Sequence, residues 1–252
     1  IFILAMFLVR PVTPVGVKIS PRLVMTKVDY SMGQMARTPV FWVIYILFVA
    51  VAAGGLMATA QLAPIAKDSG LAKLPISFFG LTLPLLTLTL SIDSIANGFT
   101  RPLTGFISDR LGRENTMLFV FIGEGLAMIG LMNFGHTAVG FLICAPLIFL
   151  FWGEIFSIFP SICADTFGTK YATGNAGFLY TAKGTASLLV PLTSVLSANG
   201  NWNRAYIFAA TLSIAAGLAA KFILEPMRKR SIENSEELAR NRFRATPVGR
   251  PM

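Results

Sequence analysis

Two positively charged side chains lie deep inside apolar stretches of this sequence. Arg101 belongs to the stretch from Phe78 to Ile107, and Lys183 belongs to the stretch from Ala172 to Leu196. Arg101 precedes Asp109 by eight residues, or ~12 Å along a helix, and Lys183 lies about eleven residues, or ~16 Å, into its stretch. In spanning helices, both would lie near the middle of a ~30 Å hydrocarbon core. Two cations at one depth would form an anion site, in which Arg grips a carboxylate through two parallel N–H bonds and Lys adds a compact charge.

Four further ionisable residues lie inside apolar stretches, namely Asp93, Glu124, Glu154 and Lys221. An ionised side chain at the middle of a bilayer costs about 3 kcal/mol, so each needs a partner, an aqueous cavity or a route to the interface. Lys221 lies near the end of its stretch with Glu225 four residues on, so we expect it to reach the interface. We interpret the two glutamates as structural partners of cations, with a water-lined position as the alternative, whereas Asp93 has no obvious partner. Pairing of the two deep cations with these glutamates is the alternative to an anion site.

Aromatic residues at helical spacing accompany the two cations. Trp152 and Phe156 are four residues apart on one expected helix, and Tyr180 precedes Lys183 by three residues on another. Together the three rings could enclose a small planar anion and exclude water. Ordinary packing of aromatic side chains is the alternative.

No pattern in the sequence is typical of an enzyme. The chain contains neither a cluster of His, Cys and carboxylate residues spaced for metal binding nor a nucleophile elbow. The single histidine, His136, falls in an expected outer turn, where capping or solvation is a better explanation than proton relay. We therefore expect no catalytic residue, no metal and no cofactor.

Membrane-spanning helices are the elements that must position these residues. The chain is 54% hydrophobic and 13% charged, with a mean hydropathy of +0.68, whereas soluble domains carry about 25% charged residues. Its net charge is +9, but the basic residues lie between apolar blocks, which indicates membrane orientation rather than nucleic-acid binding. Cys144 and Cys163 fall in one apolar block and imply no disulfide framework.

Six apolar blocks have the length of a spanning helix. They are Pro39–Ile65, Phe78–Ile107, Thr116–Phe134, Ala138–Cys163, Ala172–Leu196 and Arg204–Leu224. Leaving the distal tail aside, eleven Lys and Arg residues lie on the side of residues 10–38 and the C-terminus, and three lie on the other side. The excess of basic residues predicts that residues 10–38, the loop at Arg110 and the C-terminus face the cytoplasm.

These blocks divide the chain into four parts. Residues 1–9 are apolar but too few to span, since about 20 are needed, so we expect them to be the end of a truncated sixth helix. Residues 10–38, with three prolines and five basic residues, are expected to form a cytoplasmic connector. Residues 39–225 would form a C-terminal six-helix bundle. Residues 226–252 would form a basic cytoplasmic tail, disordered except for a short helix near residues 235–243.

One loop carries a specific motif, GFISDRLGR, from Gly105 to Arg113. Gly105 and Gly112 allow close helix approach and a tight turn, while Asp109 lies beside Arg110 and Arg113, with which it can pair. Such a cluster could latch a cytoplasmic gate, and an ordinary basic loop is the alternative. The motif resembles the loop G-x-x-x-D-R-x-G-R of the major facilitator superfamily. The resemblance implies an all-α polytopic membrane protein, here the six-helix C-terminal half of a twelve-helix carrier.

Three longer stretches resemble the oxalate/formate antiporter family. They are DYSMGQMARTPVFW, NGFTRPLTGFISDRLGRENTM and NAGFLYTAKGTASLLVP, which begin at residues 29, 97 and 175. The resemblance implies that Arg101 and Lys183 bind the substrate within an aromatic cage formed by Trp152, Phe156 and Tyr180. Phe156 and Tyr180 differ from the cage residues of that family and would alter the hydrogen bonding of the cage.

The function that these features imply is exchange of small carboxylates, such as oxalate and formate, across the cell membrane by alternating access. The alternatives are a proton-coupled monocarboxylate transporter and an anion-binding membrane sensor without flux. The monocarboxylate type has an aspartate where this chain has Asn97, which cannot carry a proton. The expected partners are a carboxylate anion, the lipid bilayer and an N-terminal six-helix half, with no nucleic acid, and the full-length protein is expected to be a monomer.

Overall fold

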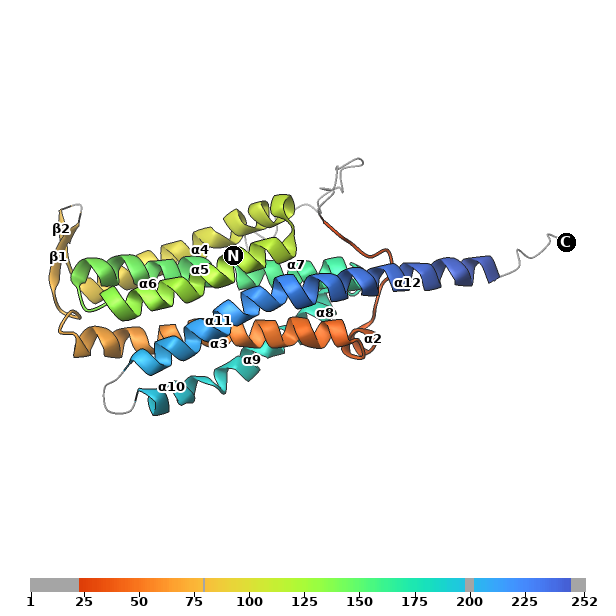
Figure 1. The fold of residues 1–252 in the computed structure, drawn as a ribbon. Coiled ribbons are helices and arrows are strands. Elements are labelled where there is room, and N and C mark those ends of the chain that lie inside the picture. Colours follow the sequence, from red (N-terminus) through yellow and green to blue (C-terminus); the bar gives the residue numbers. More distant parts are fainter. Residues whose placement is uncertain (1–22, 79, 198–201, 246–252) are drawn as a thin grey trace.

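The chain folds into a bundle of long helices that run side by side (Figure 1). This computed structural model describes residues 23–78, 80–197 and 202–245. The expected helix end at residues 1–9, the first part of the connector and residues 246–252 lie outside the described residues. The expected all-α membrane fold is confirmed.

The helices of the described chain follow one another with short connections. In chain order they are α2 (Met32–Ala36), α3 (Pro39–Asp68), α4 (Leu85–Leu111), α5 (Arg113–Phe134), α6 (Ala138–Trp152), α7 (Ile155–Phe167), α8 (Ala172–Leu179), α9 (Thr181–Ser187), α10 (Val190–Leu196), α11 (Asn203–Ala219), the π-helix η2 (Ala220–Leu224) and α12 (Glu225–Ala245). α5 packs against both α6 and α11, α4 packs against α6 and α7, and α3 packs against α9 and α11.

Four helices in the described part of the chain are long and apolar enough to cross a bilayer. They are Pro39–Asp68, Arg113–Phe134, Ala138–Phe167 and Asn203–Asn241. The two other expected spans are helical but depart from this standard: α4 carries several charged residues, and residues 172–196 are divided into α8, α9 and α10. These two spans carry Arg101 and Lys183. The irregular spans are therefore the ones that hold the candidate site.

A small β-hairpin shortens the second expected span. β1 (Pro75–Phe78) pairs antiparallel with β2 (Leu81–Pro84), with Pro75 opposite Pro84 and Phe78 opposite Leu81. Gly80 has φ +82°, a conformation that glycine adopts without strain in a tight turn. α4 consequently begins at Leu85 rather than at Phe78. The hairpin marks one end of the bundle, called here the hairpin end (Figure 1).

The opposite end, called here the connector end, carries residues 23–38 and α12 (Figure 1). In the described part of the connector, α2 directly follows Ser31, whose backbone N–H donates to Gln34 Oε1 at 2.9 Å and whose hydroxyl donates to the same oxygen at 3.1 Å. Segments of the connector also bond to the end of α7, since the backbone N–H of Thr26 donates to the carbonyl of Asp165 at 2.8 Å. The connector therefore acts as a strap across this end.

The expected disorder after residue 225 is wrong for the described part of the tail. α12 continues from α11 through η2 and projects beyond the rest of the bundle (Figure 1). Pro226 suggested a helix end, because proline lacks the N–H that would bond to the carbonyl of Phe222 and its ring crowds that carbonyl. The π-helical turn lies directly before this proline, where its wider winding fits the missing bond. Lys221 Nζ lies 2.6 Å from Glu225 Oε2, one helical turn further on.

α12 is attached to the bundle by a buried ion pair. Arg228 Nε donates to Glu114 Oε1 at 2.6 Å, and the side chains are 1% and 8% exposed. Arg228 Nη1 also donates to the carbonyl of Val24 at 2.8 Å, so one guanidinium joins α12, α5 and the connector. The charge of Arg228 is therefore used inside the protein.

Substitution of Arg228 by methionine is expected to destabilise the intact protein by about 3–5 kcal/mol, because Glu114 would remain buried without its partner. The matched control is Lys229→Met on the same helix, whose half-exposed pair with Glu225 contributes at most about 1 kcal/mol. Thermal or denaturant unfolding in detergent measures both. Equal effects of the two substitutions would contradict the role of Arg228.

Candidate anion-binding site

The structure brings the five predicted binding residues together around the ring of Phe156. The guanidinium carbon of Arg101 lies 4.9 Å from the ring centroid, and Lys183 Nζ lies 4.8 Å from the same centroid. The two charged groups therefore lie within about 10 Å of each other, in cation–π contact with one ring. α4 supplies the arginine, α9 supplies the lysine, and α7 supplies the ring between them.

The three aromatic side chains form a continuous wall beside the cations. Trp152 meets Phe156 edge to face, with centroids 5.7 Å apart and planes at 83°. Tyr180 is stacked against Phe156 at 6.4 Å, with planes at 15°. The hydroxyl of Tyr180 donates to the backbone carbonyl of Phe156 at 3.0 Å, which fixes the tyrosine ring. The aromatic residues thus support one another as well as the cations.

Neither cation forms an ion pair with any side chain that the structure describes. Arg101 Nη2 donates to the neutral amide oxygen of Asn97 at 3.3 Å, and the arginine side chain is exposed. Glu124 and Glu154 are fully buried, and their carboxyl oxygens have no hydrogen-bond partner among the described residues. The interpretation of these two glutamates as partners of the cations is therefore wrong within the described chain. Both positive charges remain available to a ligand.

A break between α6 and α7 positions Arg101 beside Phe156. Gly153 lies in this break, against α4: a Cβ atom built on it would lie 2.5 Å from Thr100 Cγ2 and 2.8 Å from the carbonyl oxygen of Asn97. Only glycine allows the two backbones to approach this closely, as is common between helices in membranes. The contact occurs one turn before Arg101. The close approach therefore brings the arginine to the level of the ring that follows the break.

Trp152 is positioned by a second close contact. Its indole lies directly over Gly55 of α3, where an added Cβ would overlap the indole Nε1, Cδ1 and Cε2 atoms. The indole is 7% exposed, and its ring edge faces Phe156. α3 thus supports the aromatic wall at Trp152, and its Phe48 also meets Tyr180 of the wall, with ring centroids 5.7 Å apart.

Lys183 lies on a separate seven-residue helix that α3 holds in place. α9 is bounded by breaks at Tyr180 and at residues 188–189. The hydroxyl of Tyr45 on α3 lies 2.8 Å from the hydroxyl of Thr185 and 3.3 Å from that of Thr181. These two threonines flank Lys183 in the sequence. Tyr45 therefore holds the short helix on both sides of Lys183, the candidate anion-binding residue.

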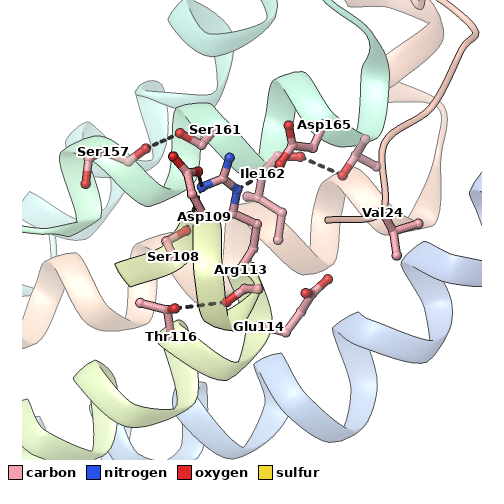
Figure 2. A network of polar contacts seen from close by, with 12 residues as sticks. Val24, Ser108, Asp109, Arg113, Glu114, Thr116, Ser157, Ser161, Ile162 and Asp165 are labelled. Carbon is pink, nitrogen blue, oxygen red and sulfur yellow. Dashed lines mark hydrogen bonds and ion pairs between the residues drawn. The ribbon is translucent and has the colours of Figure 1, made fainter. Parts of the chain in front are cut away.

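A second polar cluster lies at the connector end, around Arg113 (Figure 2). Arg113 Nη1 donates to Asp109 Oδ1 at 2.7 Å and to Ser108 Oγ at 2.6 Å. Arg113 Nε donates to Asp165 Oδ2 at 2.8 Å, which joins the start of α5 to the end of α7. The expected contact of Asp109 with an arginine of the motif is confirmed. The side chain of Asp109 is 60% exposed, whereas that of Asp165 is buried.

The remaining motif residues differ in their environments. Gly112 has φ +92° between α4 and α5, so it forms the tight turn that was expected. A Cβ atom at Gly105 would meet nothing within 4 Å among the described residues, so no close helix approach is found there. Arg110 places its guanidinium carbon 3.8 Å from the ring centroid of Phe106. The motif therefore combines a tight turn at Gly112, the exposed carboxylate of Asp109 and the buried, hydrogen-bonded guanidinium of Arg113.

The sequence interpretation missed three members of this end of the bundle: Asp165, Glu114 and Arg228. Asp165 lies two residues after the apolar block that ends at Cys163. Glu114 directly follows the motif and could have been included in the charge cluster. Because the partners are separated by 52 and 114 residues, spacing alone could not pair them.

The chain is similar to known membrane transport proteins. The family model described as Major Facilitator Superfamily matches residues 1–191 and 74–250. The chain is 35% identical over 232 residues to the oxalate:formate antiporter of Oxalobacter formigenes, a match that covers 90% of this chain and 52% of that protein.

Two other relatives have no assigned substrate. The uncharacterized MFS-type transporter YhjX of Escherichia coli K12 is 24% identical over 163 residues, which covers 64% of this chain and 38% of the relative. An uncharacterized 38 kDa protein in the 23S RNA operon of Thermoproteus tenax is 34% identical over 148 residues, with 57% and 36% covered. The chain spans about half the length, or less, of these curated relatives.

Substitution of Gly55 by alanine is expected to displace the Trp152 indole and to destabilise the intact protein by about 1–3 kcal/mol through overpacking. The fluorescence of Trp152, recorded in a variant that retains it as the single tryptophan, should report its new environment. Gly33→Ala is the control, since a Cβ there meets nothing within 4 Å. Unchanged Trp152 fluorescence and stability in Gly55→Ala would contradict the packing described.

Proposed function

Because the chain belongs to the Major Facilitator Superfamily, we propose that it forms the anion-binding half of a carrier that exchanges small carboxylates such as oxalate and formate. The family match and the apolar helices make it a multi-pass membrane protein of a transporter family. The identity to an oxalate:formate antiporter supports the substrate class. Residues 39–225 would be the transmembrane bundle of this half.

The observation that carries the proposal is the contact of two unpaired cations with one ring. A charged side chain inside a membrane protein is costly unless it is neutralised, and these two have no carboxylate partner in the described chain. A dicarboxylate such as oxalate would neutralise both at once. Arg101 offers a planar fork that matches a carboxylate, and Lys183 offers a point charge for the other end of the anion.

The aromatic wall supports a small planar anion in particular. Trp152, Phe156 and Tyr180 present flat apolar surfaces beside the cations, which would exclude water and strengthen each charge–charge interaction. The Tyr180 hydroxyl is already engaged with the Phe156 carbonyl, and Phe156 has no hydroxyl to offer. The wall would therefore select by shape, and the two cations would select by charge. A monoanion such as formate would satisfy only part of that charge on the return step.

Asn97 favours exchange over proton-coupled uptake through this arginine. It accepts a hydrogen bond from Arg101 but, as an amide, it cannot carry a proton. Counterflow in proteoliposomes tests whether the intact protein transports the anion that it binds. Oxalate binding without exchange would indicate a membrane sensor, and proton-driven lactate uptake would indicate the monocarboxylate type.

The cluster at the connector end would serve as the cytoplasmic gate. Asp109 is exposed and paired with Arg113, whereas Arg113 keeps a buried partner in Asp165. An exposed pair can open at little cost, so Asp109 and its neighbour Arg110 would exchange partners as the two halves of the carrier rock about the substrate. Gly105 and Gly112 would provide space and a turn for this movement.

The proposal extends to the orientation of the chain in the membrane and to the part of the carrier that would pack against it. The basic residues at the connector end support a cytoplasmic position for that end and for α12, in a carrier of the cell membrane. An N-terminal six-helix half would cover the face that exposes Arg101, and the intact carrier would work as a monomer.

Neutralising either cation is expected to weaken oxalate binding by about 10- to 100-fold, which corresponds to the loss of one charge-assisted interaction. Arg101→Gln and Lys183→Gln should lose more affinity for oxalate than for formate, because the dianion uses both charges. Lys221→Gln is the control, since that lysine is paired with Glu225 away from the site. Equilibrium binding and exchange by the purified carrier measure the effects. Wild-type exchange by both site variants would refute the anion site.

Asp109→Asn is expected to slow oxalate exchange several-fold while leaving equilibrium binding and thermal stability close to those of the wild type, because this pair is exposed. Asp165→Asn should instead lower stability by about 3–5 kcal/mol, because Arg113 loses a buried partner. Transport rates and unfolding curves distinguish the two. A gate role for Asp109 fails if its variant exchanges at the wild-type rate.

A further inference from the structure

Four polar groups without partners converge behind the aromatic wall. Glu124 on α5, Glu154 in the α6–α7 break and Ser213 on α11 are each 0% exposed, and the indole N–H of Trp152 is buried beside them. None of these groups has a partner at good hydrogen-bond geometry among the described residues, although Glu124 and Ser213 lie side by side next to Gly54. A buried polar group without a partner is costly, so a cluster of four requires an explanation.

The glycine pair of α3 shows that these groups lie close together. A Cβ atom on Gly54 would lie 2.9 Å from Ser213 Oγ and 3.4 Å from Glu124 Oε1, and a Cβ on the adjacent Gly55 would overlap Trp152 Nε1. Glu124 and Glu154 are near enough for their charges to repel each other. Ser213, Glu124 and the indole nitrogen of Trp152 therefore lie around one point of α3, and Glu154 follows Trp152 by two residues in the α6–α7 break.

The chemistry of the cluster favours protons over metal ions. Two carboxyl groups can each take up a proton and then act as both donor and acceptor, which would satisfy Ser213 and the indole N–H. A metal ion would be repelled by the indole donor, and no group of three or more His, Cys, Asp or Glu side chains in the described chain could hold one. Two ionised carboxylates here would have no cation among the described side chains to balance them.

We propose that Glu124 and Glu154 form a proton-binding site linked to the anion site, so that binding of the carboxylate substrate raises the proton occupancy of the pair. Trp152 joins the two sites, since its ring meets Phe156 nearly at right angles and its Nε1 lies against Gly55, next to the glycine that borders Ser213 and Glu124. With Arg101 and Lys183 unliganded, their charges favour ionised glutamates. A bound dianion cancels those charges and favours the protonated pair, and by reciprocity the protons strengthen anion binding.

The size of this linkage follows from the short path between the sites. Glu154 lies two residues from both Trp152 and Phe156 along the chain. At a separation of about 10 Å and an effective dielectric constant near 20, cancelling one charge changes proton affinity roughly tenfold. The other titratable or charged groups on the neighbouring described elements are Tyr45, Lys67 and Asp68 on α3, Asp93, Arg101, Asp109 and Arg110 on α4, Arg113 and Glu114 on α5, Cys144 on α6, Cys163 and Asp165 on α7, Tyr180 and Lys183 at and within α9, Arg204 and Tyr206 on α11, and Lys221 on η2.

The inference rests on the proposed anion binding, and one experiment separates the two. Oxalate is added to the purified intact carrier in weakly buffered detergent solution at several pH values between about 5 and 9. A pH dye records protons taken up, while calorimetry records oxalate binding. We expect the wild type to take up a fraction of a proton per oxalate bound. Glu124→Gln and Glu154→Gln should each bind oxalate but reduce the uptake at least several-fold.

Asp93→Asn is the matched control, because Asp93 is also a buried carboxyl group without a hydrogen-bond partner among the described residues. It should keep the wild-type proton uptake. Oxalate binding without proton uptake, or uptake removed by Asp93→Asn and kept by both glutamine variants, would overturn the linked proton site and leave the anion site standing. Absence of oxalate binding in the wild type would overturn the anion site itself. If a glutamine variant fails to fold, infrared spectra of the wild type and the other variant still show whether a protonated carboxyl band depends on the glutamates.

Discussion

The contact of Arg101 and Lys183 with the single ring of Phe156 is the interaction on which the rest of the structure depends. Both cations are held by an aromatic quadrupole and, in the case of the arginine, by a neutral amide. Such contacts offset only part of the cost of a charge in a membrane protein. The part of the cost of the two positive charges that these contacts do not offset favours binding of an anion between them. Glycines at the α6–α7 break and on α3 bring the helices close enough for the three elements to meet.

The connector end shows the opposite use of charge. Arg113 and Arg228 are almost buried, and each has a carboxylate at hydrogen-bond distance. These pairs join α5, α7, α12 and the connector, which would make this half of the molecule a rigid unit. The exposed contact with Asp109 is the part of the network that can open at little cost. Paired charges would thus stabilise the unit, and unpaired charges would bind its ligand.

The sequence was sufficient for the candidate site because the site depends on residue type and depth. A lysine and an arginine in the middle of apolar stretches are costly whatever the detailed packing, so their positions carry information. The sequence was insufficient wherever contacts join distant segments. The burial of Arg228 depends on a partner 114 residues away, and a π-helical turn before Pro226 carries the helix past a residue that usually ends one. The glutamates were assigned to the cations on charge alone, whereas the fold places them behind Trp152.

The most direct test of the account is the structure of the intact carrier with bound oxalate. One anion is expected beside Phe156, with an oxygen about 2.7–3.0 Å from a guanidinium nitrogen of Arg101 and another at a similar distance from Lys183 Nζ. An oxalate bound elsewhere, with both cations paired to carboxylates of the N-terminal half, would contradict it.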